Sequence, residues 1–132
     1  MKKRVLIIED NERNLILEKD LLEVAGLEVF TAVNAQSGIS IAQKEKPDVI
    51  LMDVRLPDML GTEAAEKLRA DDATRDILII FVTASVMGDE MKLVTAFSNS
   101  GYISKPIDTH TFAEDIMRLL RCHEVCKTPV TL

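Results

Sequence analysis

The fold of this chain is decided by residues 48–57, which read Asp48-Val49-Ile50-Leu51-Met52-Asp53-Val54-Arg55-Leu56-Pro57. Four consecutive apolar residues precede Asp53, and a proline follows four positions after it. A short apolar run with a turn signal behind it predicts a strand buried on both faces, which is typical of a parallel sheet covered by helices. Because ligands bind beyond the carboxyl ends of strands in open α/β sheets, Asp53 is the candidate reacting group.

The composition is that of one soluble globular domain. The chain has 132 residues, of which 47% are hydrophobic and 29% charged, and this length buries an ordinary core without metal or disulfide staples. A net charge of −6 argues against direct nucleic-acid binding, which needs a basic surface. No apolar run approaches the ~20 residues that span a bilayer, and Glu9 ends the first run too early for a signal peptide. We therefore expect a cytoplasmic protein without membrane insertion.

Two cysteines, Cys122 and Cys126, flank His123 near the C-terminus. Two thiols and one imidazole do not complete a tetrahedral metal site, and the usual paired spacing of metal-binding cysteines is absent. We expect both thiols to be reduced, as in other cytosolic chains.

Apolar runs and helical patterns alternate five times along the chain. Strands are predicted at 5–8, 28–32, 49–52, 77–82 and 101–104. Helices are predicted between Asn11 and Gly26 and over 36–46, 62–70, about 87–97 and 109–122. This alternation predicts an α/β fold with an open parallel sheet and helices on both faces. The domain is expected to span residues 1–121, followed by a short tail over 122–132.

Leu17 and Val24 lie away from the apolar face of the first predicted helix. They are either scattered surface hydrophobes, which are common, or part of a partner-docking face beside the end of the first strand.

Reactive side chains follow four of the predicted strands. Glu9 and Asp10 follow the first, Asp53 the third, Thr83 the fourth and Lys105 the fifth. In a doubly wound five-stranded parallel sheet of strand order 2-1-3-4-5 these ends meet at one crevice, with Asp53 in the centre. Each residue alone is more simply explained as a cap, a turn residue or a solvated charge, whereas the whole set in this order indicates a site.

Three carboxylates in one crevice repel one another unless a proton or a cation intervenes. Mg²⁺ is the natural cation, since it binds carboxylate oxygens together with waters and a phosphoryl oxygen. The ammonium of Lys105 and the hydroxyl of Thr83 then supply donors for the other phosphoryl oxygens. This interpretation makes Asp53 a nucleophile that forms an aspartyl phosphate.

The sequence resembles the receiver domain of the two-component response-regulator family over about residues 2–121. The resemblance rests on Glu9-Asp10, Asp53 with Pro57 and Gly61, Thr83-Ala84, and Tyr102 with Lys105-Pro106. It implies a flavodoxin-like (βα)5 fold in which Asp53 accepts a phosphoryl group from a sensor histidine kinase or a histidine phosphotransfer protein. Mg²⁺ would be bound by Asp10, Asp53 and the Arg55 backbone carbonyl, with Glu9 acting through water.

The resemblance also implies how the signal leaves the site. Thr83 and Tyr102 resemble the switch pair of the family, in which the hydroxyl moves toward the phosphoryl group and the aromatic ring fills the vacated space. A downstream protein target would then bind the face formed by the fourth helix, the fifth strand and the fifth helix. Without the resemblance, Tyr102 is simply a half-buried aromatic residue with a solvated hydroxyl.

Two further expectations rest on the resemblance alone. Arg55 and Ser85 lie where side chains control the access of water to an acyl phosphate, so they are expected to tune its lifetime. The bond between Lys105 and Pro106 is expected to be cis, an isomer found in only about 5–6% of X-Pro bonds. The protein is thus expected to be a signalling switch, not an enzyme, although it assists its own phosphoryl transfer and dephosphorylation.

Three other functions compete with this interpretation. A Mg²⁺-dependent phosphatase with an aspartate nucleophile uses a similar sheet, but usually has a second acid where this chain has Arg55. A flavin-binding electron carrier needs a loop rich in Ser, Thr and Gly where this chain has Glu9-Asp10-Asn11. A phosphorylation-independent interaction module does not need the reactive residues. As a receiver, the chain could serve as a phosphorelay shuttle, a motor effector or a regulator of a kinase.

Overall fold

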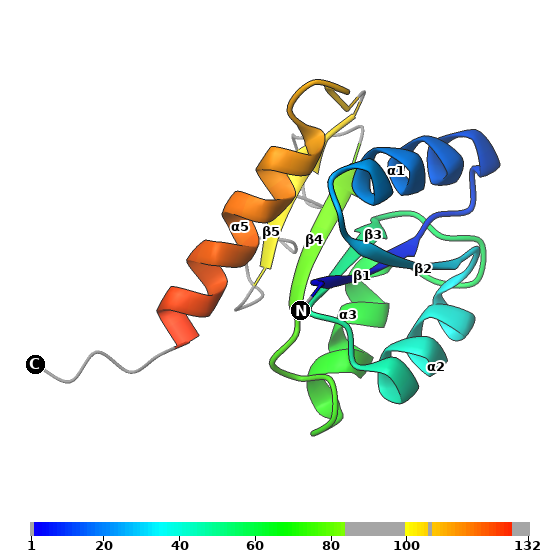
Figure 1. Cartoon of the computed structure of the whole chain (residues 1–132). Helices are drawn as coiled ribbons and strands as arrows, with labels where there is room; N and C mark the ends of the chain where they lie inside the picture. Colours follow the sequence, from blue (N-terminus) through cyan, green and yellow to red (C-terminus); the bar gives the residue numbers. More distant parts are fainter. Residues whose placement is uncertain (1, 84–99, 106, 128–132) are drawn as a thin grey trace, which may run out of the picture.

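A computed structural model of the chain describes residues 2–83, 100–105 and 107–127 (Figure 1). Five parallel strands form one sheet in the order β2-β1-β3-β4-β5. The strands are β1 (Arg4–Ile8), β2 (Glu28–Ala32), β3 (Val49–Asp53), β4 (Leu78–Thr83) and β5 (Ser100–Ser104). The predicted strand order is therefore confirmed, and β3 lies at the centre of the sheet.

The described helices are α1 (Glu12–Val24), α2 (Ala35–Glu45), α3 (Gly61–Ala70) and α5 (Phe112–Lys127). The helix predicted at about 87–97 lies outside the described residues. No described helix is both long enough and apolar enough to cross a bilayer.

Helix α5 differs from its prediction at both ends. It begins at Phe112, because the carbonyl oxygen of Asp108 accepts hydrogen bonds from the amides of Thr111 and Phe112 and holds the preceding residues in a turn. It continues to Lys127, so part of the segment that we expected to be a tail is helical. Short-range turn chemistry decides the first boundary, and helical periodicity alone does not reveal it.

Helices cover both faces of the sheet (Figure 1), and a hydrophobic layer fills the space on each side. Side chains alternate along β1 and β3, so Leu6 and Ile50 pack toward α2 and α3, while Val5 and Leu51 pack toward α1 and α5. Residues 49–52 are fully buried, as predicted for a central strand with helices on both sides.

The loop after Asp53 is fixed at two points. The amide of Gly61 donates a hydrogen bond to the Val54 carbonyl oxygen at 2.6 Å, and a Cβ at position 61 would collide with the carbonyl oxygen of Asp53. The carboxylate of Asp58 accepts hydrogen bonds from the first amides of α2, those of Ala35 and Gln36, at 2.9 Å each. These bonds, with the Ala35 amide the largest contribution, lower the pKa of Asp58. Position 61 therefore requires glycine, because the Asp53 carbonyl oxygen lies so close to it. The hydrogen bonds of Asp58 also attach the loop to the start of α2.

Candidate functional site

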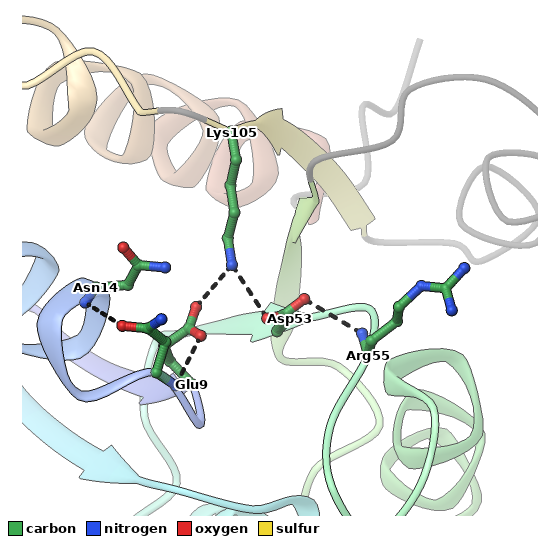
Figure 2. Close-up of polar contacts among 6 residues, drawn as sticks. Glu9, Asn14, Asp53, Arg55 and Lys105 are labelled. Carbon is green, nitrogen blue, oxygen red and sulfur yellow. Dashed lines mark hydrogen bonds and ion pairs between the residues drawn. The ribbon is translucent and has the colours of Figure 1, made fainter.

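Three of the predicted strand-end residues, Glu9, Asp53 and Lys105, meet at the carboxyl edge of the sheet (Figure 2). The ammonium nitrogen of Lys105, which follows β5, lies 3.0 Å from Oε2 of Glu9 and 3.1 Å from Oδ2 of Asp53. Glu9 follows β1, and Asp53 is the last residue of β3. Residues far apart in the sequence thus form one ionic cluster.

Asp10 completes a group of three carboxylates. One oxygen from each of Glu9, Asp10 and Asp53 lies within 4.8 Å of the others. Glu9 is buried, Asp53 is partly buried and Asp10 is exposed to solvent. Three hard oxygen donors at this spacing, open to water on one side, fit a divalent cation such as Mg²⁺.

Backbone amides orient the carboxylates. The Asn11 amide donates to Oε1 of Glu9 at 3.1 Å, and the Arg55 amide donates to Oδ1 of Asp53 at 3.2 Å. Asn11 is also the N-cap of α1, where its side chain accepts a hydrogen bond from the Asn14 amide. Since capping residues fix the entry of the chain into a helix, the start of α1 and the position of Glu9 are set together.

Lys105 is held from both ends. Its amide donates to the Thr83 carbonyl oxygen at 2.7 Å, and its ammonium bridges the two carboxylates. Burial lowers the pKa of Lys105, but the hydrogen bonds to Glu9 and Asp53 outweigh burial and raise the pKa overall. Burial, together with the charge of Asp53, raises the pKa of Glu9, although Lys105 and the Asn11 amide lower it in part. Lys105 therefore remains an ammonium while its most buried partner resists ionisation.

The other predicted residues lie around this cluster. Thr83 is buried at the end of β4, and Tyr102 on β5 is 48% exposed. The Arg55 side chain is exposed and points away from Glu9 and Lys105 (Figure 2). The switch and lifetime roles assigned to these residues remain predictions. Ala84, Ser85 and Pro106 lie outside the described residues.

Sequence reasoning missed one acidic residue near the site, Glu18 on α1. Its side chain is buried, with 2% of the residue exposed, and its Oε2 accepts no hydrogen bond from any described residue. Burial, followed by the charge of Glu9, raises the pKa of Glu18 to about 8. A helical spacing of three from Leu15 and four from Leu22 could have placed Glu18 on the buried face of the helix.

Glu18 is expected to make folding stability depend on pH. Its pKa rises from an ordinary 4.5 to about 8 in the folded protein, so between these values the folded state binds more protons than the unfolded state. The free energy of unfolding must therefore fall as pH rises across this window, by up to about 3–5 kcal/mol. Urea unfolding at pH 5.5, 7 and 8.5 should show this loss, and Glu18→Gln should remove most of it.

The matched control for this measurement is Glu23→Gln. Glu23 lies on the same helix, is solvent-exposed and pairs with Lys19, so its substitution should change stability by less than about 1 kcal/mol at every pH. Parallel pH profiles for wild type and Glu18→Gln would contradict the assignment of this pH dependence to Glu18.

The sequence matches the response regulator receiver domain family over residues 5–117. It is 39% identical over 120 residues to the polar-differentiation response regulator DivK of Brucella anthropi, and the alignment covers 91% of this chain and 98% of that protein. The DivK protein of Brucella ovis is 38% identical to this chain, and the alignment again covers 91% of this chain and 98% of that protein. The family match over residues 5–117 includes the carboxyl ends of all five strands.

Solved structures of similar proteins share the fold. The CheY-like receiver domain protein of Methanospirillum hungatei has a TM-score of 0.85 at 31% identity, with 95% of this chain and 98% of that chain covered. The receiver domain of a sensor histidine kinase from Pseudomonas aeruginosa, which has a magnesium ion in its active-site cleft, has a TM-score of 0.82 at 26% identity, covering 92% of this chain and 99% of that one. The chain belongs to the response regulator receiver domain family of two-component signalling.

Proposed function

We propose that this chain acts as a single-domain response regulator, with Asp53 accepting a phosphoryl group from a phosphohistidine. The donor is a sensor histidine kinase or a histidine phosphotransfer protein. The observation that carries the proposal is the position of the Lys105 ammonium, which contacts both Asp53 and Glu9 at the carboxyl edge of the sheet. A lysine held between two carboxylates at this edge is suited to the negative charge of an incoming phosphoryl group.

The transfer forms one bond and breaks another. A carboxylate oxygen of Asp53 attacks phosphorus, the bond between phosphorus and the donor imidazole breaks, and the electron pair stays on that imidazole. The Arg55 amide holds Oδ1 of Asp53 in place, and the Lys105 ammonium neutralises charge on the phosphoryl oxygens. These contacts position the acceptor before the donor arrives, which lowers the entropic part of the barrier.

The metal that fits this site is Mg²⁺. We assign it to the carboxylates of Asp10 and Asp53 and the backbone carbonyl of Arg55, with Glu9 acting through water. The 4.8 Å grouping of the three acidic side chains supports this assignment. Bound there, the ion supplies positive charge to the phosphoryl oxygens.

The switch pair that we propose is Thr83 and Tyr102. Thr83 ends β4 in register with Ser104 of β5, and Tyr102 lies two residues earlier on that strand with an exposed side chain. Movement of the hydroxyl toward the phosphoryl group would let the ring turn inward and change the face that includes β5 and α5. A downstream protein would bind this face. A local change of charge at Asp53 would thus alter a distant surface. Arg55 and Ser85 would tune the lifetime of the phosphoryl group.

The docking face for the phosphoryl donor that we propose lies on α1. Leu17 and Val24 are 39% and 89% exposed there, and α1 starts beside Glu9 and Asp10. The 39% identity with a polar-differentiation response regulator favours control of cell polarity or differentiation over a motor role. The compartment we propose is the cytoplasm, since phosphohistidine donors are charged from ATP.

The proposal is tested by incubating the protein with acetyl phosphate and Mg²⁺ and measuring its intact mass. We expect one added phosphoryl group, and chelation of Mg²⁺ with EDTA should reduce the modified fraction by at least about tenfold, since charge neutralisation by the ion is worth several kcal/mol. A pull-down that compares beryllofluoride-treated and untreated protein should then recover a partner only from the treated form. Equal modification with and without the metal would contradict the assigned role of the acidic cluster.

A further inference from the structure

A small pocket of about 110 Å³ lies beside the Lys105 side chain. It is lined by Asn14, Leu17, Glu18, Lys105 and Ile107. One wall is thus α1, and the other is formed by residues that follow β5. The space is comparable to the volume of about three to four water molecules, enough for a lysine head group to enter.

The carboxyl group of Glu18 is the unusual part of this pocket. It is buried, and its Oε2 has no hydrogen-bond donor among the described residues. A buried carboxyl oxygen without a donor costs free energy, so native proteins usually satisfy it. Three charged groups act on Glu18 from the neighbouring strand ends. Glu9 and Asp53 disfavour its ionisation, and Lys105 favours it.

Lys105 and a divalent cation share carboxylate partners. The ammonium contacts Glu9 and Asp53, and both residues belong to the carboxylate group that fits Mg²⁺. Two positive groups in one small cluster repel each other. Occupation of the cluster by the metal therefore favours withdrawal of the ammonium. The lysine side chain already lines a pocket whose Glu18 carboxyl group has an Oε2 without a hydrogen-bond donor among the described residues.

We propose that Glu18 is a positioning residue that receives the Lys105 ammonium when Mg²⁺ occupies the site formed by Asp10 and Asp53, with Glu9 acting through water. This inference rests on the proposed function. The backbone of Lys105 stays bonded to Thr83, while its four-carbon side chain turns from Asp53 to Glu18. Glu18 then releases its proton to solvent and pairs as a carboxylate with the ammonium. Lys105 returns to Asp53 when the phosphoryl group adds negative charge there.

The test measures Mg²⁺ binding by calorimetry on the full chain, for wild type and Glu18→Gln. Proton release is measured at pH 7 by repeating the titration in buffers that differ in ionisation heat. For each Mg²⁺ bound, wild type should release close to one more proton than Glu18→Gln does, because burial keeps Glu18 protonated before binding. At pH 8.5, Glu18→Gln should bind Mg²⁺ about tenfold more weakly, as expected for the loss of a charged hydrogen bond. Glu23→Gln, with the same charge change on the same helix, should match wild type.

A double-mutant cycle shows whether the effect passes through Lys105. In a Lys105→Met background, Glu18→Gln should leave the Mg²⁺ affinity unchanged within about twofold. Equal proton release and equal affinity for wild type and Glu18→Gln would overturn the inference, and so would a Glu18→Gln effect that persists without Lys105. Glu18→Leu, which fills the pocket with an apolar group, should show the same weakened binding.

Failure of the inference can be distinguished from failure of the proposed function. If the inference alone is wrong, wild type and Glu18→Gln bind Mg²⁺ alike and both accept a phosphoryl group from acetyl phosphate. If the proposed function is wrong, neither protein is phosphorylated.

Discussion

Replacing Asp53 with asparagine should abolish phosphorylation by acetyl phosphate and by a phosphohistidine donor. The amide has no anionic oxygen to attack phosphorus, while its size and its hydrogen bond from the Arg55 amide can be retained. Intact mass after incubation with Mg²⁺ and acetyl phosphate should show only unmodified protein, where wild type gains one phosphoryl group. Loss of a covalent nucleophile removes the reaction pathway entirely.

The matched control for this experiment is Asp20→Asn. Asp20 is an exposed acid on α1, so the substitution makes the same change of charge away from the carboxyl edge of the sheet, and phosphorylation should proceed as in wild type. Circular dichroism of Asp53→Asn should match that of wild type. A folded Asp53→Asn protein that still gains the phosphoryl group would show that another residue is the acceptor.

Replacing Lys105 with methionine should destabilise the protein and impair phosphorylation. The Glu9 side chain is 2% exposed and that of Asp53 is 14% exposed, so loss of the ammonium leaves two carboxylates close together without their cation. Removing one partner of a buried ion pair costs about 3–5 kcal/mol, and we expect about 3 kcal/mol at pH 8 because Lys105 itself is partly exposed. Urea unfolding measures this difference.

The destabilisation by Lys105→Met should shrink as pH falls. Burial raises the pKa of Glu9 in the folded protein, and loss of Lys105 removes a neighbour that lowers it. In the variant, the folded state therefore takes up a proton on Glu9 at a higher pH than the unfolded state does, so stability rises as pH falls toward 5. A destabilisation that is constant between pH 5 and 8 would contradict this explanation.

Lys19→Met is the control for the stability measurement. Lys19 pairs with Glu23 on the surface of α1, with both side chains more than 40% exposed, and exposed pairs of this kind contribute at most about 1 kcal/mol. The phosphorylation rate should also separate the two variants. Lys105→Met should be slower by about 100-fold or more, as for loss of one donor to a developing anion, while Lys19→Met should match wild type.

The sequence by itself determined the parallel sheet and which polar residues lie at the carboxyl ends of its strands. The buried run at 49–52 and the alternation of strands and helices predicted an open parallel sheet with helices on both faces, because a strand with apolar residues on both faces needs helices on both sides. The observed strand order is one of the common orders of such sheets. In such a sheet all carboxyl ends lie at one edge. The meeting of Glu9, Asp53 and Lys105 follows from topology, and their sequence positions were sufficient to predict it.

Only the tertiary structure decided what lies across from each side chain. Three features join segments that are far apart in the sequence and that no periodic pattern links. They are the pocket that Glu18 and Lys105 both line, the anchoring of α2 by Asp58 and the contact that requires glycine at position 61. Hydrophobic periodicity reports which face of an element is buried, but it does not name the neighbour. An unpaired acid beside the reactive lysine therefore became visible only when the packed helices were in place, because its environment comes from other strands and not from its own helix.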